Sequence, residues 1–324
     1  MAKETGAFSV YGAVGNREDL INRIFDISPT DCPVTMAIGT SRATAIKHEW
    51  QTDVLATHTA DNAHTSGEGY AYTEPAATVR PANYTQILRK TIKITGTQEA
   101  VDKAGRASEL GYQASKRSKE MKRDLEASVT SNNPSVAGND TTARKLGGLR
   151  AWLTSNTSIG ATGSDGGFNT GTGIVAAATN GTQRALTKAL LDGVIKSCFV
   201  NGAELRMLSV GPHNKQVFSG LLADTKVAQQ RTNVSGDGQM TIYGGADVYV
   251  SDFGSLNVVA NRFQPERNAY LVDPDYASVA ALRNTRIERP AKTGDALNWV
   301  IIEEKTLRVD NEKAHGVVAD LETS

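Results

Sequence analysis

KHEWQTDVLATHTADNAHTSGEGYAYTEPAATVR, residues 47–80, is the stretch that decides the fold of this chain. Between its two ends 32 residues pass without a Lys or Arg, while the stretch carries the carboxylates of Glu49, Asp53, Asp61, Glu68 and Glu74. Apolar and polar residues alternate over 46–54 and again over 88–94, which predicts the two strands of a long hairpin arm. A two-stranded ribbon is marginally stable in water. The arm therefore needs an outside support, and a neighbouring copy of the same protein is the simplest one.

Length and charge bound the class of protein. The 324 residues suffice for two ordinary domains or for one large α/β or α+β body with a substantial core. Lys plus Arg and Asp plus Glu both total 35, so the formal net charge is zero. A net charge of zero argues against a protein whose main task is to bind nucleic acid phosphates. We expect any contact with nucleic acid to be local and weak.

Cysteine usage and hydropathy indicate the compartment. Cys32 and Cys198 are the only cysteines and have no C-x-x-C spacing, which supports neither a disulfide framework nor a zinc site. Synthesis in a reducing cytosol follows. The first residues lack the apolar core of a signal peptide, and no later run approaches the roughly 20 apolar residues of a membrane span. We therefore expect no cleaved signal and no crossing of a bilayer.

The first half of the chain contains one dominant helical pattern. A short helix is predicted around 16–27, and the hydrophobic period changes from two to nearly four at Gly96-Thr97. Residues 98–132 are predicted to form a single helix of roughly 50 Å if unbroken, with Thr97 as its N-cap. Its thin apolar stripe favours a spine with one packed side, and Pro134 follows its end.

The second half is predicted to be compact. Residues 151–182 hold seven glycines and one charge, Asp165, so a loop or edge strand is expected there and no structured core. Further on, the pattern predicts helices at 185–200 and from Pro212, strands at 205–210, 269–272 and 298–309, and a hairpin at 246–260. The predicted class is mixed α+β.

Residues that could carry chemistry have simpler structural explanations. No phosphate-binding loop, nucleophile elbow or H-E-x-x-H motif is present. His58 and His64 flank Asp61 without a fourth ligand, which favours a solvated or interface role over a metal site. Asp273 and Asp275 around Pro274 suit a turn, and Cys198 lies on an apolar helix face. The charged run at 116–126, which mixes basic residues with Glu120, Asp124 and Glu126, is typical of a solvated, ion-paired surface. No catalytic residue, metal or cofactor is predicted.

Several stretches together resemble one family. GTQEAVDKAGR at 96–106 resembles the spine helix of tailed-phage major head proteins, and YVSDFG at 249–254 with NRF at 261–263 resembles their hairpin. LVDPDY at 271–276, KTGDA at 292–296 and NEKAHG at 311–316 complete the resemblance, which spans most of residues 84–320.

The resemblance implies the α+β Hong Kong 97-type capsid fold with five parts. They are an N-terminal arm (1–45), an extended β-hairpin loop (46–97), a peripheral domain with the spine helix and the Gly/Ser/Thr-rich segment (98–184), an axial domain (185–265), and a return to the peripheral domain (266–324). Only about 45 residues precede the hairpin, so a separate scaffolding protein is expected. No residue trio matches the covalent crosslink of the type member, and no crosslink is expected.

The expected function is structural. The chain is interpreted as the major capsid subunit of a tailed virus, forming hexamers and pentamers in an icosahedral shell around double-stranded DNA, with scaffolding, portal and decoration proteins as partners. The virion is the expected location. Candidate interface residues are Trp50, Glu68, Tyr70, Tyr72, Glu74, Arg89 and Lys93, and Lys119 and Arg123 are the candidates to face the packaged DNA.

Two other classes stay open at this point. An extracellular or tail-associated protein could bind a surface glycan through its Gly/Ser/Thr-rich loops, although the repeats or trimeric β-helix pattern that would favour it are not visible. An enzyme with a hydrolase-like fold is disfavoured because no nucleophile, base and orienting acid can be assembled from the residues.

Overall fold

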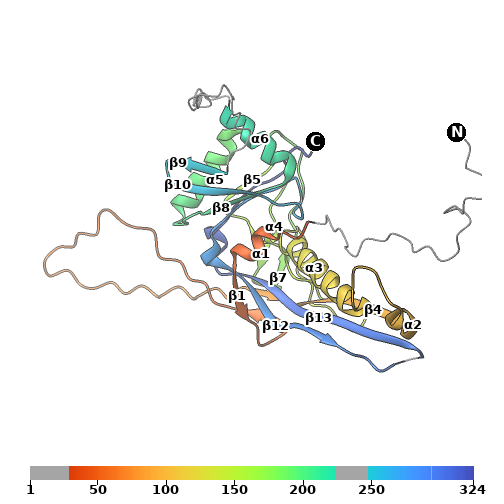
Figure 1. Cartoon of the computed structure of the whole chain (residues 1–324). Helices are drawn as coiled ribbons and strands as arrows, with labels where there is room; N and C mark the ends of the chain where they lie inside the picture. Colours follow the sequence, from red (N-terminus) through yellow and green to blue (C-terminus); the bar gives the residue numbers. More distant parts are fainter. Residues whose placement is uncertain (1–28, 224–246, 293) are drawn as a thin grey trace, which may run out of the picture.

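A four-stranded sheet forms the base of the molecule. The computed structural model describes residues 29–223, 247–292 and 294–324, so the helix predicted at 16–27 lies outside the described residues. The strand order is β1 (Gly39–Arg42), β12 (Ala277–Glu288), β13 (Ala296–Val309) and β4 (Gln86–Thr95). β1 runs parallel to β12, and the other two pairings are antiparallel (Figure 1).

The partner of β4 differs from the expected one. β4 pairs with β13 in an unbroken register from Thr95 opposite Ala296 to Gln86 opposite Lys305, and not with residues 46–54. Its alternating pattern was recognised correctly, because Leu88, Ile92 and Ile94 are buried. The pairing was wrong because alternation identifies a strand but not its neighbour, and β13 follows some 200 residues later.

The spine is shorter than predicted. The helix expected over 98–132 is two helices, α2 (Gly96–Ala100) and α3 (Glu109–Val129), and the N-caps are Thr95 and Ser108 rather than Thr97. α2 ends because Val101 takes an extended conformation (φ −66°, ψ 137°), and Gly105 follows in the linker with φ 78°. The Glu99 carboxylate then accepts hydrogen bonds from the backbone N–H groups of Glu109 and Leu110, so α3 begins anew. Its 21 residues span about 32 Å.

One face of α3 packs on the sheet, as the narrow stripe predicted. Leu110, Ala114, Met121, Leu125 and Val129 are buried in the first of two hydrophobic clusters, which also contains residues of β4 and β13. None of the described helices is both long and apolar enough to cross a membrane.

A second, six-stranded sheet carries the other cluster. Its order is β5 (Thr157–Ser158), β14 (Gly316–Val318), β11 (Ala269–Val272), β8 (Met207–Val210), β10 (Gly254–Ala260) and β9 (Val248–Ser251). The helices α5 (Lys188–Val200) and α6 (Pro212–Ala223) accompany it (Figure 1). The predicted helices, strands and hairpin of this half are confirmed. Short helices η3 (Pro274–Tyr276) and η4 (Glu312–Ala314) form the turns before β12 and β14, and the turn predicted at Asp273 is confirmed.

The Gly-rich segment is more ordered than expected. It contains the end of α4 (Leu149–Trp152), β5, and a hairpin of β6 (Gly167–Asn169) and β7 (Ile174–Ala176). β5 confirms the predicted edge strand. The prediction that this segment contributes no structured core is wrong, since Trp152 and Val175 are buried in the first cluster. The buried carboxylate of Asp320 accepts hydrogen bonds from the N–H groups of Gly160 and Gly181. The composition of the Gly-rich segment cannot reveal a hydrogen-bonding partner as distant in sequence as Asp320.

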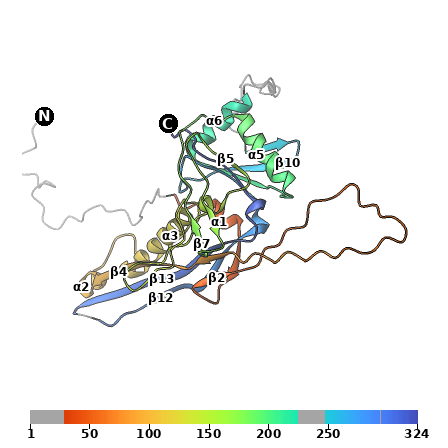
Figure 2. The ribbon, with the colours of Figure 1, turned by 180° about the vertical axis from the view of Figure 1, so that it is seen from behind.

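The arm leaves the body from a short ladder. β2 (Lys47–Glu49) pairs with β3 (Ala82–Tyr84), and a single bridge joins Thr52 to Val79. Beyond that bridge residues 53–78, all of them described, add no further β-ladder. Figures 1 and 2 both show this stretch as an open loop projecting from the side of the molecule opposite α2.

Candidate assembly surfaces

The arm exposes the side chains that the sequence proposed for a subunit interface. Tyr70 and Tyr72 are 89% and 93% exposed, and Glu68 and Glu74 are exposed as well. These four positions are spaced by two, which places them on one side of an extended chain. The described residues of this chain bury neither tyrosine, so both rings are free to meet another molecule.

His64 of the arm belongs to a local turn. Glu68 accepts a hydrogen bond from the Thr65 N–H at 3.1 Å, and its carboxylate lies 3.3 Å from Nδ1 of His64. Nε2 of His64 contacts the side chain of Asn62. No described group of three His, Cys, Asp or Glu side chains could hold a metal ion.

Trp50 does not have the predicted role. Its ring is 8% exposed and lies 5.4 Å, centroid to centroid, from Trp152, which in turn stacks on Phe168 at 5.8 Å. The ring of His48 lies 5.8 Å, centroid to centroid, from that of Trp50. The expectation that Trp50 anchors a neighbouring subunit is therefore wrong, because this ring fixes the root of the arm to its own body.

Arg89 and Lys93 lie on the exposed face of β4. They alternate with the buried Leu88 and Ile92, so they point away from α3, and neither forms an ion pair with a described residue. Across the same face Glu304 binds Arg144 at 2.5 Å and Arg283 at 2.8 Å. This face therefore retains free positive charge at β4.

The exposed side of α3 is ion-paired over part of its length. Lys90 on β4 binds Asp124 at 2.6 Å, and Arg117 binds Glu120 at 2.7 Å, which confirms the expected pairing there. Lys119 is exposed. Arg123, the second candidate to face DNA, is half-buried with its guanidinium 5.3 Å from the centre of the Phe263 ring.

Glu126 contradicts the interpretation of that charged run as solvated. Its carboxylate is fully buried and accepts hydrogen bonds from the Val34 N–H at 2.9 Å, the Thr35 N–H at 2.8 Å and Asn261 Nδ2 at 2.7 Å. It joins α3 to the start of α1 (Pro33–Ala37) and to the end of β10. Glu126 precedes Val129 by three residues, and residues with that spacing are neighbours on a helix. This spacing is the sequence signal that could have revealed the burial of Glu126.

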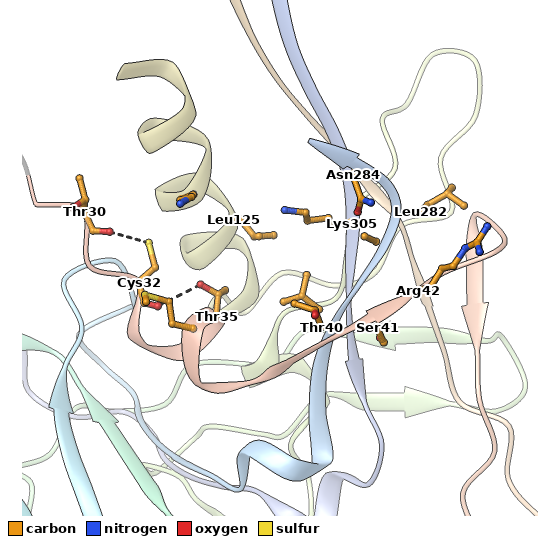
Figure 3. Close-up of a pocket in the computed structure, with 14 residues that line it drawn as sticks. Thr30, Cys32, Thr35, Thr40, Ser41, Arg42, Leu125, Leu282, Asn284 and Lys305 are labelled. Atoms are coloured by element: carbon orange, nitrogen blue, oxygen red, sulfur yellow. Dashed lines mark hydrogen bonds between the residues drawn. The ribbon is translucent and has the colours of Figure 1, made fainter. Parts of the chain in front are cut away.

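A cavity of about 880 Å³ lies beside α3 and was not foreseen from the sequence. Residues of α1, β1, α3, β12 and β13 line it, and Figure 3 shows their side chains around one shared space, from Thr30 at one end to Arg42 at the other. The cationic lining residues are Arg42, Lys122 and Lys305. Lys305 binds Glu303 at 2.7 Å, whereas Arg42 and Lys122 form no ion pair with a described residue. Five separate segments contribute residues to this groove, so no single sequence motif predicts it.

The strongly perturbed titratable groups are structural. His315 is fully buried, its Nδ1 accepts from the Asp273 N–H at 3.3 Å, and its Nε2 lies 3.2 Å from the Tyr276 carbonyl oxygen. Burial lowers the pKa of this imidazole to about 4. Burial raises the pKa of the Cys198 thiol to about 12 and that of the Cys32 thiol to about 11. None of the three is an accessible acid, base or nucleophile at neutral pH.

Comparison with known proteins agrees with this geometry. The major capsid protein of Escherichia phage Phieco32 is 28% identical over 339 residues, covering 96% of this chain and 96% of that protein. Among solved structures, a chain of the cyanophage A-1(L) capsid superposes with a TM-score of 0.65 at 13% identity, over 97% of this chain and 98% of that chain. A capsid chain of a native GTA particle gives 0.62 at 12% identity, over 97% and 98%.

These superpositions confirm the Hong Kong 97-type capsid fold expected from the sequence. The glycan-binding alternative receives no support from them. A family model described as SU10 major capsid protein matches residues 5–322, nearly the whole length. The chain therefore belongs to the SU10 major capsid protein family.

Proposed function

We propose that this major capsid protein assembles as hexamers and pentamers into an icosahedral shell that encloses the double-stranded DNA of a tailed phage. Membership in a major capsid family supports a structural rather than an enzymatic protein. The observation that carries the mode of assembly is the arm, which the described part of this chain leaves without a partner. The mature location is the virion, after synthesis in the host cytoplasm, and the proposed partners are scaffolding, portal and decoration proteins.

The five-part division follows from the same proposal. The four-stranded sheet and α3 correspond to a peripheral domain, and the second hydrophobic cluster corresponds to an axial domain that faces the capsomer centre. The proposed boundaries are 1–45, 46–97, 98–184, 185–265 and 266–324. Contacts between the axial parts of several copies close each capsomer into a ring.

The arm is long enough to reach a neighbour. Residues 53–78 run out and back, about 13 residues each way, which corresponds to about 40 Å of extended chain. The loop carries Asp53, Asp61, Glu68 and Glu74 and no Lys or Arg. We propose that its carboxylates meet cations of an adjoining copy, among them the exposed Arg89 and Lys93. Because such charges are screened by salt, association weakens as ionic strength rises.

Deletion of residues 56–79 tests this function. The two hydrophobic clusters contain no residue of that range, so the truncated chain is expected to fold. It is expected to form no shells in electron microscopy and to sediment as small species. A matched control removes two of the four exposed charges of the loop without shortening it, by Asp61→Asn with Glu74→Gln, and is expected to assemble with weaker association.

Circular dichroism of the deletion variant separates failed folding from failed assembly. Normal particles from a folded deletion variant would contradict the role of the arm. We further propose that Lys119 and Arg123 face the lumen. Lys119→Glu with Arg123→Glu is expected to lower genome retention in otherwise intact particles, and unchanged DNA content per particle would reject that orientation of α3.

A further inference from the structure

The groove beside α3 gathers positive charge from three separate elements. Arg42 of β1, Lys122 of α3 and Lys305 of β13 line it, and no described lining residue is acidic. Like charges in one space repel each other, so this lining costs free energy unless an anion lies among them. We propose that the groove binds a compact anion of linked phosphate groups, such as a nucleoside triphosphate or tripolyphosphate. The site lies within one chain, so the inference goes beyond the proposed assembly and does not depend on it.

Two carboxylates near the groove are already engaged. Glu303 binds Lys305 at 2.7 Å, which offsets one of the three cations. Glu126 accepts hydrogen bonds from backbone N–H groups at the start of α1 and is fully buried. Arg42 and Lys122 form no ion pair with a described residue. Both are therefore available to an anion.

The rest of the lining adds hydrogen-bond donors and an apolar wall. Thr40 and Asn284 line the groove, and their side chains form no hydrogen bond with a described residue, so both can donate to phosphate oxygens. Figure 3 shows Lys305 in the middle of the groove and Arg42 at one end, so the cations are spread along it. The apolar side chains, which suit the base and sugar of a nucleotide, are those of Met36, Leu125, Val279 and Leu282.

The spread of the cations favours linked phosphates over a single phosphate. Phosphate oxygens accept paired hydrogen bonds from an Arg guanidinium and bind a Lys ammonium as a point charge. A chain of two or three phosphates can contact cations at more than one point along the groove. The groove volume of about 880 Å³ lies within the range of roughly 300–1,000 Å³ typical of ligand pockets, and it is too small to enclose a nucleic acid duplex.

The absence of acidic groups from the described lining predicts how Mg²⁺ affects binding. Proteins bind Mg²⁺ through one or two carboxylates together with the substrate phosphates, and this lining supplies no carboxylate. Mg²⁺ also neutralises part of the phosphate charge that the cations attract. The metal-free anion is therefore expected to bind more tightly than its Mg²⁺ complex.

A bound anion would connect elements that are distant in sequence. Residues of α1, β1, α3, β12 and β13 line the groove, so the anion contacts the helices and the sheet together. A ligand that binds only the folded chain shifts the unfolding equilibrium toward that state. Saturating tripolyphosphate is therefore expected to raise the melting temperature of the unassembled chain.

Titration of the full-length, unassembled chain with a fluorescent ATP analogue tests the site. In Mg²⁺-free buffer of low ionic strength, the wild-type chain is expected to show saturable binding that tripolyphosphate displaces. Arg42→Gln with Lys122→Gln is expected to weaken binding about tenfold or more, because charge-assisted hydrogen bonds are lost. Arg42→Lys with Lys122→Arg keeps both charges and is expected to recover most of the affinity. The matched control, Lys116→Gln with Lys145→Gln, removes two exposed cations outside the groove and is expected to bind like the wild type.

The competing explanations give different results. No saturable binding by the wild-type chain at about 1 mM ligand, or equal losses in the groove and control variants, would refute the site. A nucleotide that tripolyphosphate does not displace would be held through its base, which would overturn the assignment to phosphates. Displacement by a short DNA duplex at equal phosphate concentration would assign the cations to nucleic acid and overturn the inference as well. Shell formation by the wild-type chain is scored separately, so a failure of binding leaves the proposed function standing.

Protection of an introduced thiol gives a readout that does not depend on the charge variants. Thr40 lines the groove and is exposed, so Thr40→Cys in a Cys32→Ser background reports its occupancy. Tripolyphosphate at about ten times its Kd is expected to slow alkylation of this thiol about tenfold, since only the free chain reacts. Thr91→Cys on the exposed face of β4 is the matched control and is expected to react at an unchanged rate. Equal rates for Thr40→Cys with and without tripolyphosphate would place any bound anion outside the groove and overturn the inference.

Discussion

His315 makes the stability of this chain depend on pH in a specific window. Its imidazole is fully buried at the turn between η4 and β14, and burial lowers its pKa from 6.5 to about 4. In the neutral form one ring nitrogen accepts from the Asp273 N–H and the other donates to the Tyr276 carbonyl. A second proton would disrupt the first contact and leave a charge in the core.

The sign and size follow from proton linkage. Above about pH 6.5 both folded and unfolded chains hold a neutral His315, and its contribution to stability is complete. Between that pH and about 4 the unfolded chain binds a proton that the folded chain does not, so stability falls as the pH falls. The full loss is about 3 kcal/mol, of which about 2 kcal/mol is reached by about pH 5.

Urea unfolding of the unassembled chain at about pH 7.5 and pH 5 measures this loss against a His315→Gln variant. His48, whose pKa is also lowered by burial, is present in both proteins, so its contribution cancels in the comparison. The wild-type chain is expected to lose about 2 kcal/mol more than the variant over that interval. Parallel pH dependences would show that His315 is solvated or already charged, and would refute the reasoning.

Three other substitutions or reactions probe features outside the arm. Glu126→Gln leaves the half-buried Thr35 N–H facing an amide N–H and is expected to cost about 2–4 kcal/mol in chemical unfolding, whereas the matched Glu120→Gln should cost under about 1 kcal/mol. Cys32 is expected to react about 100-fold more slowly with a thiol reagent at about pH 8 than an ordinary thiol, because its raised pKa depletes the thiolate, and full reaction before unfolding would contradict its burial. Gly148→Ala places a methyl group against the Ser131 carbonyl and is expected to lower stability by roughly 2–3 kcal/mol, with an unchanged melting temperature as the opposing outcome.

The sequence predicted the elements better than their partners. Periodicity located β4, α5, β8 and β11, because each is a local pattern on a half-buried or buried element. It did not identify β13 as the partner of β4, since strand pairing is decided by contacts between distant segments. The break between α2 and α3 escaped because the apolar stripe continues across residues 101–108, whereas Val101 is extended and Gly105 is left-handed in the linker.

For the candidate site too, the sequence predicted local features and missed those that depend on distant segments. Exposure of Tyr70, Tyr72 and Glu74 could be predicted from a stretch too polar to form a core. Trp50 was misplaced because the aromatic rings that bury it, Trp152 and Phe168, come from a segment that composition alone described as loop. The groove could not be predicted from the sequence because its cationic side chains come from three separate elements, β1, α3 and β13.

The strand order of the four-stranded sheet has a consequence for synthesis. β13 lies between β12 and β4, yet it is made nearly 200 residues after β4. Until it emerges from the ribosome, β4 has an unsatisfied edge and the platform under α3 is open. A chain cut short before residue 296 would lack the middle strand of its own sheet. Completeness of translation thus becomes a condition for entering the shell, and prematurely terminated subunits are excluded by their own topology.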